Sequence, residues 1–271
     1  MVTLFERDLV DTGRRSSKGN QLKWRCDGIW YKADYTGYEA LSEYIISHLL
    51  MKSILTPDEF VLYDLEDIAY KSSVFHGAKS PDLLHDDWQI ITLERLFKTV
   101  YGKSLNELIY KTEDHTDRLK LIVEQTERIT KLKGFDVYMA KLLTIDALFL
   151  NEDRHTHNIA ILANGDGDYK LCPFFDQGAG LLSDTTMDYP LDADVFSLME
   201  QARAKTFYTD FEEQVEIAEK LYGQQITFSF GKKDVDKLLS KVNRSMYNEQ
   251  IIERVRTILY QQMRKYGYLF K

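Results

Sequence analysis

The chain has 271 residues, a length that suits one large domain or two lobes that share a cleft. Hydrophobic residues make up 44% and charged residues 29% of it, as in ordinary soluble globular proteins. The net charge of −8 argues against a surface built to bind nucleic acid or an anionic membrane. No apolar run has the length of a membrane span, and Cys26 and Cys172 lack metal-ligand spacing. We therefore expect a soluble, cytoplasmic protein with reduced thiols.

The first 70 residues predict short strands around one helix. Strand patterns occupy residues 3–10, 21–26, 28–33, 59–63 and 67–71, with Asp27-Gly28 as a hairpin turn. Residues 37–52 have helical spacing, because Leu41, Ile45 and Leu49 fall on one face. Residues 71–87 are polar and predict an irregular hinge. This places an N-terminal lobe at residues 1–72 and a helical C-terminal lobe at residues 73–271.

After residue 88 the apolar patterns are mainly helical. Helices are predicted at residues 89–101, 104–111, 116–133, 135–150, 211–222, 233–242 and 250–266. The helix at 135–150 is apolar on nearly every side and should be buried. Residues 158–162 and 169–172 are apolar runs separated by a Gly- and Asp-rich turn, which is typical of a β-hairpin.

Polar residues with a chemical role follow the buried helix. The run Asn151-Glu-Asp-Arg-His-Thr-His-Asn158 leads into the hairpin, and a second acid, Asp176, follows it before Gln177 and Gly178. Phosphoryl transfer needs one carboxylate to orient a hydroxyl, and an amide and a second carboxylate to hold Mg²⁺. In protein kinases the base precedes the metal-binding Asn by five residues, as Asp153 precedes Asn158 here.

These segments resemble the motifs of HipA-type serine/threonine kinases. Residues 151–158 look like the family's N-x-D-R-H-x-x-N catalytic loop, and Pro173-Phe-Phe-Asp176 is similar to its P-x-x-D metal segment. Upstream, Ser16-Ser-Lys-Gly-Asn-Gln-Leu-Lys23 resembles its phosphate loop, while Lys32 and Glu43 resemble its strand lysine and helix glutamate. The resemblance implies an α+β, protein-kinase-like two-lobed fold with a β-rich N-lobe and a larger helical C-lobe.

The resemblance also implies a role for each matching residue. Asp153 would be the catalytic base, and Asn158 and Asp176 would bind Mg²⁺. Lys32 would contact the phosphates of ATP and pair with Glu43, although Glu39 lies one helical turn away and stays an alternative. The phosphate loop would cover ATP with Ser16, Ser17, Gly19, Gln21 and Lys23.

The family suggests regulation and partners as well. HipA-type kinases can phosphorylate a serine of the phosphate loop and so inactivate themselves, and Ser16 is the matching position, with Ser17 beside it. Some members are toxins of toxin–antitoxin systems, which makes a protein substrate and an antitoxin partner expectations here. The chain departs from the family by beginning almost at the phosphate loop, like its compact members, and by having Leu22 where the loop carries Glu.

Other classes of function stay open on the sequence. A pseudokinase that serves as a binding module, or a kinase for a small molecule or lipid, would use the same motifs. His155 and His157 could instead belong to the metal site of a hydrolase, with a further ligand from His48, His76, His85 or His115. As part of a kinase loop, His155 would orient that loop.

Overall fold

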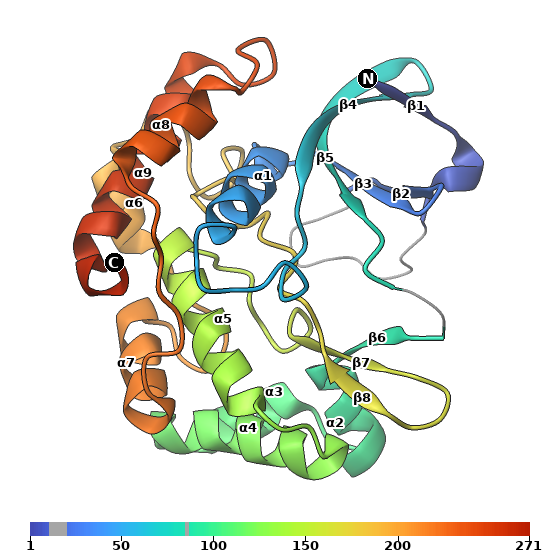
Figure 1. Ribbon diagram of the computed structural model, residues 1–271, viewed down its shortest axis with the longest axis vertical. Helices are drawn as coiled ribbons and strands as arrows, with labels where there is room; N and C mark the ends of the chain where they lie inside the picture. Colours follow the sequence, from blue (N-terminus) through green and yellow to red (C-terminus); the bar gives the residue numbers. More distant parts are fainter. Residues whose placement is uncertain (11–20, 85–86) are drawn as a thin grey trace. The chain divides into compact units, whose positions relative to one another are not determined.

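The computed structural model describes residues 1–10, 21–84 and 87–271 (Figure 1). The chain divides into two compact units. The first unit contains Met1–Leu83, Phe175–Ala202 and Thr227–Lys271, and the second contains Leu84–Phe174 and Arg203–Ile226. No helix formed by the described residues is long and apolar enough to cross a membrane.

A curled five-stranded sheet organises the first unit (Figure 1). Its strand order is β1-β4-β5-β3-β2, in which β1 and β4 are parallel and all other neighbours are antiparallel. The strands are β1 (Val2–Leu4), β2 (Lys23–Cys26), β3 (Ile29–Ala33), β4 (Asp64–Tyr70) and β5 (Ser73–Pro81). One core cluster on this sheet consists of Leu4, Trp24, Tyr31, Ala33, Ile68 and Tyr70.

The predicted β2–β3 hairpin is confirmed. Asp27 and Gly28 form its two-residue loop with φ of 51° and 74°, the left-handed values that a type I′ turn requires. Side chains alternate between the two faces of a strand. Tyr31 and Ala33 therefore enter the core cluster from β3, and Lys32 points to the opposite face of the sheet.

Two strand predictions and one prediction of irregular structure in this unit were wrong in detail. Residues 3–10 form only the short β1, followed by a 3₁₀ helix, η1 (Glu6–Asp8). Residues 59–63 form no strand. Most of the segment expected to be irregular is β5, which pairs with β4 on one side and β3 on the other. Hydrogen bonds to β3 and β4 stabilise this polar segment as a strand, although its composition did not predict one. The lobe boundary after residue 72 stays a prediction.

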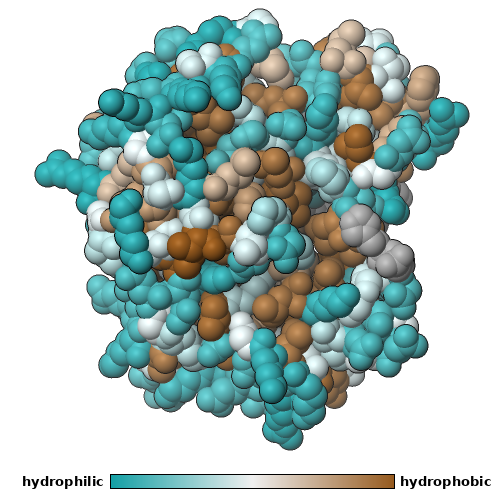
Figure 2. Space-filling view, viewed as in Figure 1, coloured by the Kyte–Doolittle hydropathy of each residue, from teal (hydrophilic) through white to brown (hydrophobic). Residues whose placement is uncertain are grey.

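Helix α1 (Glu39–Leu50) packs against β4 and β5 and is buried along most of its length. It agrees with the helix predicted at residues 37–52. The first unit also contains α6 (Val195–Gln201), which the sequence did not predict, and α8 (Lys232–Ser240), α9 (Glu249–Lys265) and η2 (Gly267–Leu269). On the face shown in Figure 2, hydrophilic residues cover most of the surface and hydrophobic residues emerge between them in small groups.

Helix α5 (Phe135–Phe149) is the buried centre of the second unit, as its apolar sequence predicted, and it packs against α4 and α7. The other helices of this unit are α2 (Leu93–Tyr101), α3 (Leu105–Lys111), α4 (His115–Thr130) and α7 (Phe211–Tyr222). Capping residues explain where several helices begin. Thr92, Ser104 and Asp114 each accept a hydrogen bond from a backbone N–H in the first turn of α2, α3 and α4.

A three-stranded antiparallel sheet lies beside these helices. Its order is β6 (Gln89–Thr92), β7 (Ala160–Ala163) and β8 (Tyr169–Leu171). The β7–β8 hairpin is the predicted one. Residues 89–92 were expected to begin a helix, but they pair with β7 as a strand before Thr92 caps α2.

Candidate active site

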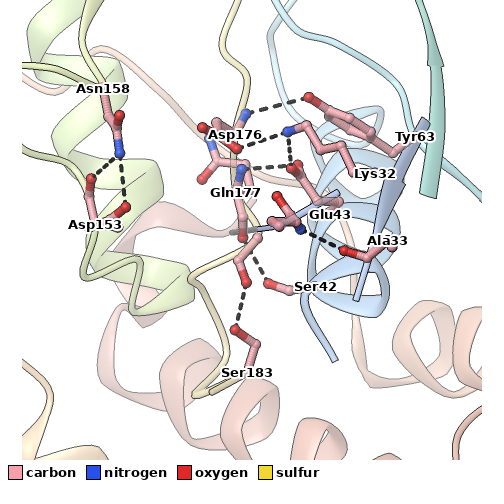
Figure 3. Close-up of polar contacts among 12 residues, drawn as sticks. Lys32, Ala33, Ser42, Glu43, Tyr63, Asp153, Asn158, Asp176, Gln177 and Ser183 are labelled. Carbon is pink, nitrogen blue, oxygen red and sulfur yellow. Dashed lines mark hydrogen bonds and ion pairs between the residues drawn. The ribbon is translucent and has the colours of Figure 1, made fainter. Parts of the chain in front are cut away.

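Lys32 lies at the centre of an ion-pair cluster in the first unit (Figure 3). Its Nζ is 2.7 Å from Glu43 Oε1 and 2.8 Å from Asp176 Oδ1, so strand β3, helix α1 and the segment after β8 meet at one ammonium group. Glu39 instead accepts hydrogen bonds from the backbone N–H groups of residues 35–37. Glu43, and not Glu39, is therefore the glutamate that pairs with Lys32, which the sequence had left open.

Burial and charge act in opposite directions in this cluster. The Lys32 and Glu43 side chains are 13% and 2% exposed. Burial alone would lower the pKa of Lys32, but the charges of Asp176 and Glu43 raise it well above its ordinary value. Burial raises the pKa of the Glu43 carboxyl, and the Lys32 ammonium offsets part of that rise. The Asp176 side chain is 31% exposed, so this carboxylate can still reach a ligand.

Asp176 is held in an uncommon backbone conformation. Its φ is 60°, in the left-handed region that Asp adopts more readily than most residues with a side chain. Its N–H donates to the Tyr63 hydroxyl at 3.5 Å, and the Tyr63 ring centroid lies 5.1 Å from Lys32 Nζ. Tyr63 thus contacts both members of the Lys32–Asp176 pair.

The segment that follows Asp176 is fastened to α1. Gln177 N–H donates to Glu43 Oε2 at 2.9 Å, and Ser42 Oγ donates to the Gln177 carbonyl at 2.9 Å. Ser183 Oγ closes the turn by donating to the Gly178 carbonyl at 2.6 Å (Figure 3). These bonds couple the position of Asp176 to the helix that carries Glu43.

The predicted phosphate loop is described only in part. Gln21 Nε2 donates to the Ala33 carbonyl at 2.9 Å, and Lys23 is the register partner of Lys32 on β2. The two residues therefore flank the end of β3 that bears Lys32. Ser16, Ser17 and Gly19 lie outside the described residues.

Asp153 and Asn158 form a second polar group, in the second unit. Asn158 Nδ2 donates to Asp153 Oδ2 at 3.0 Å and to the Asp153 carbonyl at 2.7 Å. The amide nitrogen thus faces Asp153, which directs the amide oxygen away from it. The Asp153 side chain is 16% exposed. The five-residue spacing in the sequence therefore produces direct contact between these two side chains.

A buried ion pair supports the loop that carries them. Arg154 Nε lies 3.0 Å from Asp146 Oδ2 near the end of α5, and both side chains are under 5% exposed. Arg154 Nη1 also donates to the Asn158 carbonyl at 2.9 Å. Burial raises the pKa of the Asp146 carboxyl, and the Arg154 guanidinium opposes that rise. The pair holds both ends of the 153–158 loop against α5.

His155 lies beside Asp153. Its Nε2 is 3.6 Å from Asp153 Oδ1, and its Nδ1 accepts a hydrogen bond from the His157 N–H at 3.2 Å. Burial lowers the pKa of His155, while the Asp153 charge acts in the opposite direction. Among residues 1–10, 21–84 and 87–271, no three His, Cys, Asp or Glu side chains gather as metal ligands. The histidine-based hydrolase site therefore gains no support from this part of the chain.

Among solved structures, the chain is similar to the Helicobacter pylori proinflammatory kinase CtkA. The TM-score is 0.56 at 14% identity, over 90% of each chain. The chain has a protein-kinase-like, two-lobed fold. This confirms the α+β kinase fold that the HipA-type resemblance implied.

The chain is also similar to a chain from the Shewanella oneidensis MR-1 complex of HipA, HipB and operator DNA. The TM-score is 0.48 at 9% identity, over 96% of this chain and 63% of that one. No protein-family model and no curated protein matches the sequence.

Three residues that support these two polar groups, each within its own unit, were not identified from the sequence. Tyr63 contacts Lys32 and Asp176, Asp146 supports Arg154, and Ser42 fixes the Gln177 carbonyl. The role of Asp146 could have been predicted from the sequence, since a carboxylate near the end of an apolar helix needs a buried partner. The roles of Tyr63 and Ser42 could not have been predicted, because aromatic and small polar residues are common in any core.

Proposed function

We propose that the protein is an ATP-dependent phosphotransferase that transfers the γ-phosphate of Mg·ATP to a serine or threonine hydroxyl of a protein. The observation that carries the proposal is the position of Lys32 between Glu43 and Asp176. Protein kinases need a strand lysine paired with a helix glutamate, and a metal-binding aspartate, all in place at once. Here one ammonium group contacts both carboxylates.

Each group then has a chemical task. Lys32 would contact the α- and β-phosphates, with Glu43 holding its ammonium in position. The Asp176 carboxylate and the Asn158 amide oxygen are hard oxygen donors of the kind that Mg²⁺ prefers, so the residues present fit this ion. When bound, Mg²⁺ would neutralise charge on the transferred phosphate. Asp153 would orient the acceptor hydroxyl and accept its proton.

The geometry of Asp153 suits a base. Asn158 fixes its carboxylate from one side, and His155 lies on the other. A fixed carboxylate keeps one proton-accepting direction, which general-base catalysis requires. His155 would orient this carboxylate and take no proton itself.

The resemblance to HipA-type kinases supports two further parts of the proposal. The loop with Ser16, Ser17, Gly19, Gln21 and Lys23 would cover the ATP phosphates, and phosphorylation of Ser16 or Ser17 would inactivate the enzyme. A phosphoryl group there would add negative charge beside the triphosphate. A toxin role with an antitoxin partner would follow if the active kinase phosphorylates an essential protein of its own cell.

Transfer of label from γ-labelled ATP to lysate proteins tests the proposal. We expect labelled proteins with phosphoserine or phosphothreonine, and a loss of about 10²–10⁴-fold in rate for Asp153→Asn. Asp176→Ala should weaken nucleotide binding in magnesium. Asp166→Asn, in the exposed turn between β7 and β8, is the matched control and should behave as wild type. Label on lipids or small molecules only, or ATP binding without any transfer, would contradict the proposal.

Intact-mass measurement tests self-inactivation. Wild-type protein incubated with Mg·ATP should gain the mass of a phosphoryl group and lose activity. The Ser16→Ala/Ser17→Ala variant should gain no mass at this loop and stay active. Equal activity loss in both proteins would disprove inactivation through these serines.

A further inference from the structure

A short segment of the second unit is fastened beside the Asp153 loop. The Arg203 N–H donates to Glu152 Oε1 at 2.7 Å, and Thr206 Oγ1 donates to the Arg154 carbonyl at 2.7 Å. Glu152 and Arg154 are the two neighbours of Asp153 in the chain. The segment at residues 203–206 therefore lies alongside the proposed base, held at both of its ends.

The side chains of this segment alternate between buried and exposed. Ala204 and Thr206 are 2% and 1% exposed, while Arg203 and Lys205 face solvent. The Ala204 N–H donates to the Thr209 carbonyl at 3.0 Å, which further fixes the backbone. Two cationic side chains thus project from a rigid stretch of backbone next to Asp153.

A cationic group at this place has a chemical consequence. The chain as a whole carries a net charge of −8, so an acidic substrate would be repelled from much of its surface. The two exposed cationic side chains of Arg203 and Lys205 beside the Asp153 loop would attract an acidic group at this place. Lysine and arginine side chains bind carboxylates through charge-assisted hydrogen bonds.

We propose that Lys205, together with Arg203, binds an acidic side chain next to the acceptor hydroxyl, so that the preferred substrates are Ser or Thr residues flanked by Asp or Glu. This inference rests on the proposed kinase function. Lys205 would be a residue that determines specificity, because it contacts the substrate away from the reacting atoms. Its effect should therefore fall on KM for the peptide more than on kcat.

Synthetic peptides with one serine flanked by Glu, Gln or Lys test the proposal. Wild-type enzyme should show a KM about tenfold lower for the Glu peptide than for the Gln peptide. Lys205→Ala should remove that difference with a smaller change in kcat. Lys205→Glu should reverse the preference, so that the Lys peptide becomes the better substrate. Reversal by charge exchange is a readout that a purely structural role of Lys205 would not produce.

Lys133→Glu is the matched control. Lys133 is an exposed lysine before the start of α5, whereas Asp153 follows the end of this helix, about 22 Å along its axis. This variant makes the same charge change and should keep the wild-type preference. If Lys133→Glu also reverses the peptide preference, the net charge of the protein and not a local contact of Lys205 would determine that preference, and the proposal would be wrong.

The remaining outcomes separate this inference from the proposed function. Wild-type enzyme that phosphorylates all three peptides equally well would overturn the inference and leave the kinase function standing. A Lys205→Ala variant with raised KM for ATP and unchanged KM for peptide would also overturn it, because Lys205 would then bind nucleotide. Failure of the wild-type enzyme to phosphorylate any peptide or lysate protein would overturn both.

Discussion

The hydroxyl of Tyr247 donates a 2.6 Å hydrogen bond to Asp34 Oδ2 and joins residues 213 positions apart in the chain. Asp34 Oδ1 accepts a second hydrogen bond, also 2.6 Å, from the backbone N–H of Ala40 in the first turn of α1. Asp34 follows Lys32 by two residues. One carboxyl group therefore connects the loop before α9 and the end of β3 to the helix that carries Glu43.

Asp34→Asn should change how stability depends on pH. Burial raises the pKa of Asp34 to about 8, against about 3.9 in an unfolded chain. Between these values the folded state holds a proton that the unfolded state lacks, so Asp34 lowers stability by about 1.4 kcal/mol per unit of rising pH. Asparagine cannot ionise. Its amide oxygen can still accept from the Ala40 N–H, and its NH₂ group can donate to the Tyr247 oxygen. Relative to the variant, wild-type protein should therefore become steadily less stable from pH 5 to about pH 8, and the difference should level off above that.

Urea unfolding of both proteins at several pH values in this range measures the difference. Other titrating groups contribute equally to wild type and variant, so the difference between them isolates Asp34. Two curves that stay parallel from pH 5 to pH 9 would show that Asp34 is ionised throughout.

Lys32→Met should destabilise the folded protein even without nucleotide. Its removal leaves the buried Glu43 carboxyl without the ammonium partner that lies 2.7 Å away. Breaking a buried ion pair from one side costs about 3–5 kcal/mol. Lys79→Met is the control, since Lys79 pairs with Glu66 at 2.8 Å on the same sheet but is 36% exposed, and we expect a loss below about 1 kcal/mol. Urea unfolding measures both free energies of unfolding. Similar losses of stability in the two variants would contradict the prediction that the buried ion pair contributes more than the exposed one.

Asn158→Ala should raise the magnesium concentration needed for half-maximal activity. With its amide nitrogen bound to Asp153, Asn158 would have its amide oxygen left to bind the metal under the proposed function. We expect a shift of roughly tenfold, the effect typical of a lost metal contact. A magnesium titration at saturating ATP measures it. Asn106→Ala, at an exposed position of α3, should leave the midpoint unchanged, and a common midpoint for both variants would remove Asn158 from the metal site.

Gly37→Ala should disturb the contact between the start of α1 and the segment after Asp176. A Cβ at Gly37 would lie 1.9 Å from the Ser183 carbonyl oxygen, and backbone would have to move. Thermal unfolding should show a clear loss of stability, together with weaker nucleotide binding, because α1 carries Glu43. Gly267→Ala, where a Cβ meets nothing within 4 Å, is the control. Equal melting temperatures for the two variants would contradict the tight contact.

Local sequence determined the features that depend on neighbouring residues. The Asp27-Gly28 turn, the burial of the apolar α5 and the β7–β8 hairpin all follow from short-range patterns, and the structure contains them. The five-residue spacing likewise brought Asp153 and Asn158 into contact within one loop. In each case the decisive groups are close in the chain, so backbone geometry alone brings them together.

Tertiary structure decided the features that depend on distant partners. Nothing local shows that residues 73–81 form a central strand, because its hydrogen-bond partners are the strands on either side. The choice of Glu43 over Glu39 needed the orientation of α1 against β3, since both glutamates lie on one helical face. Asp34 and Tyr247 could not be paired from sequence for the same reason. A sequence records which groups need partners, whereas the packing of distant segments selects the partner that each one obtains.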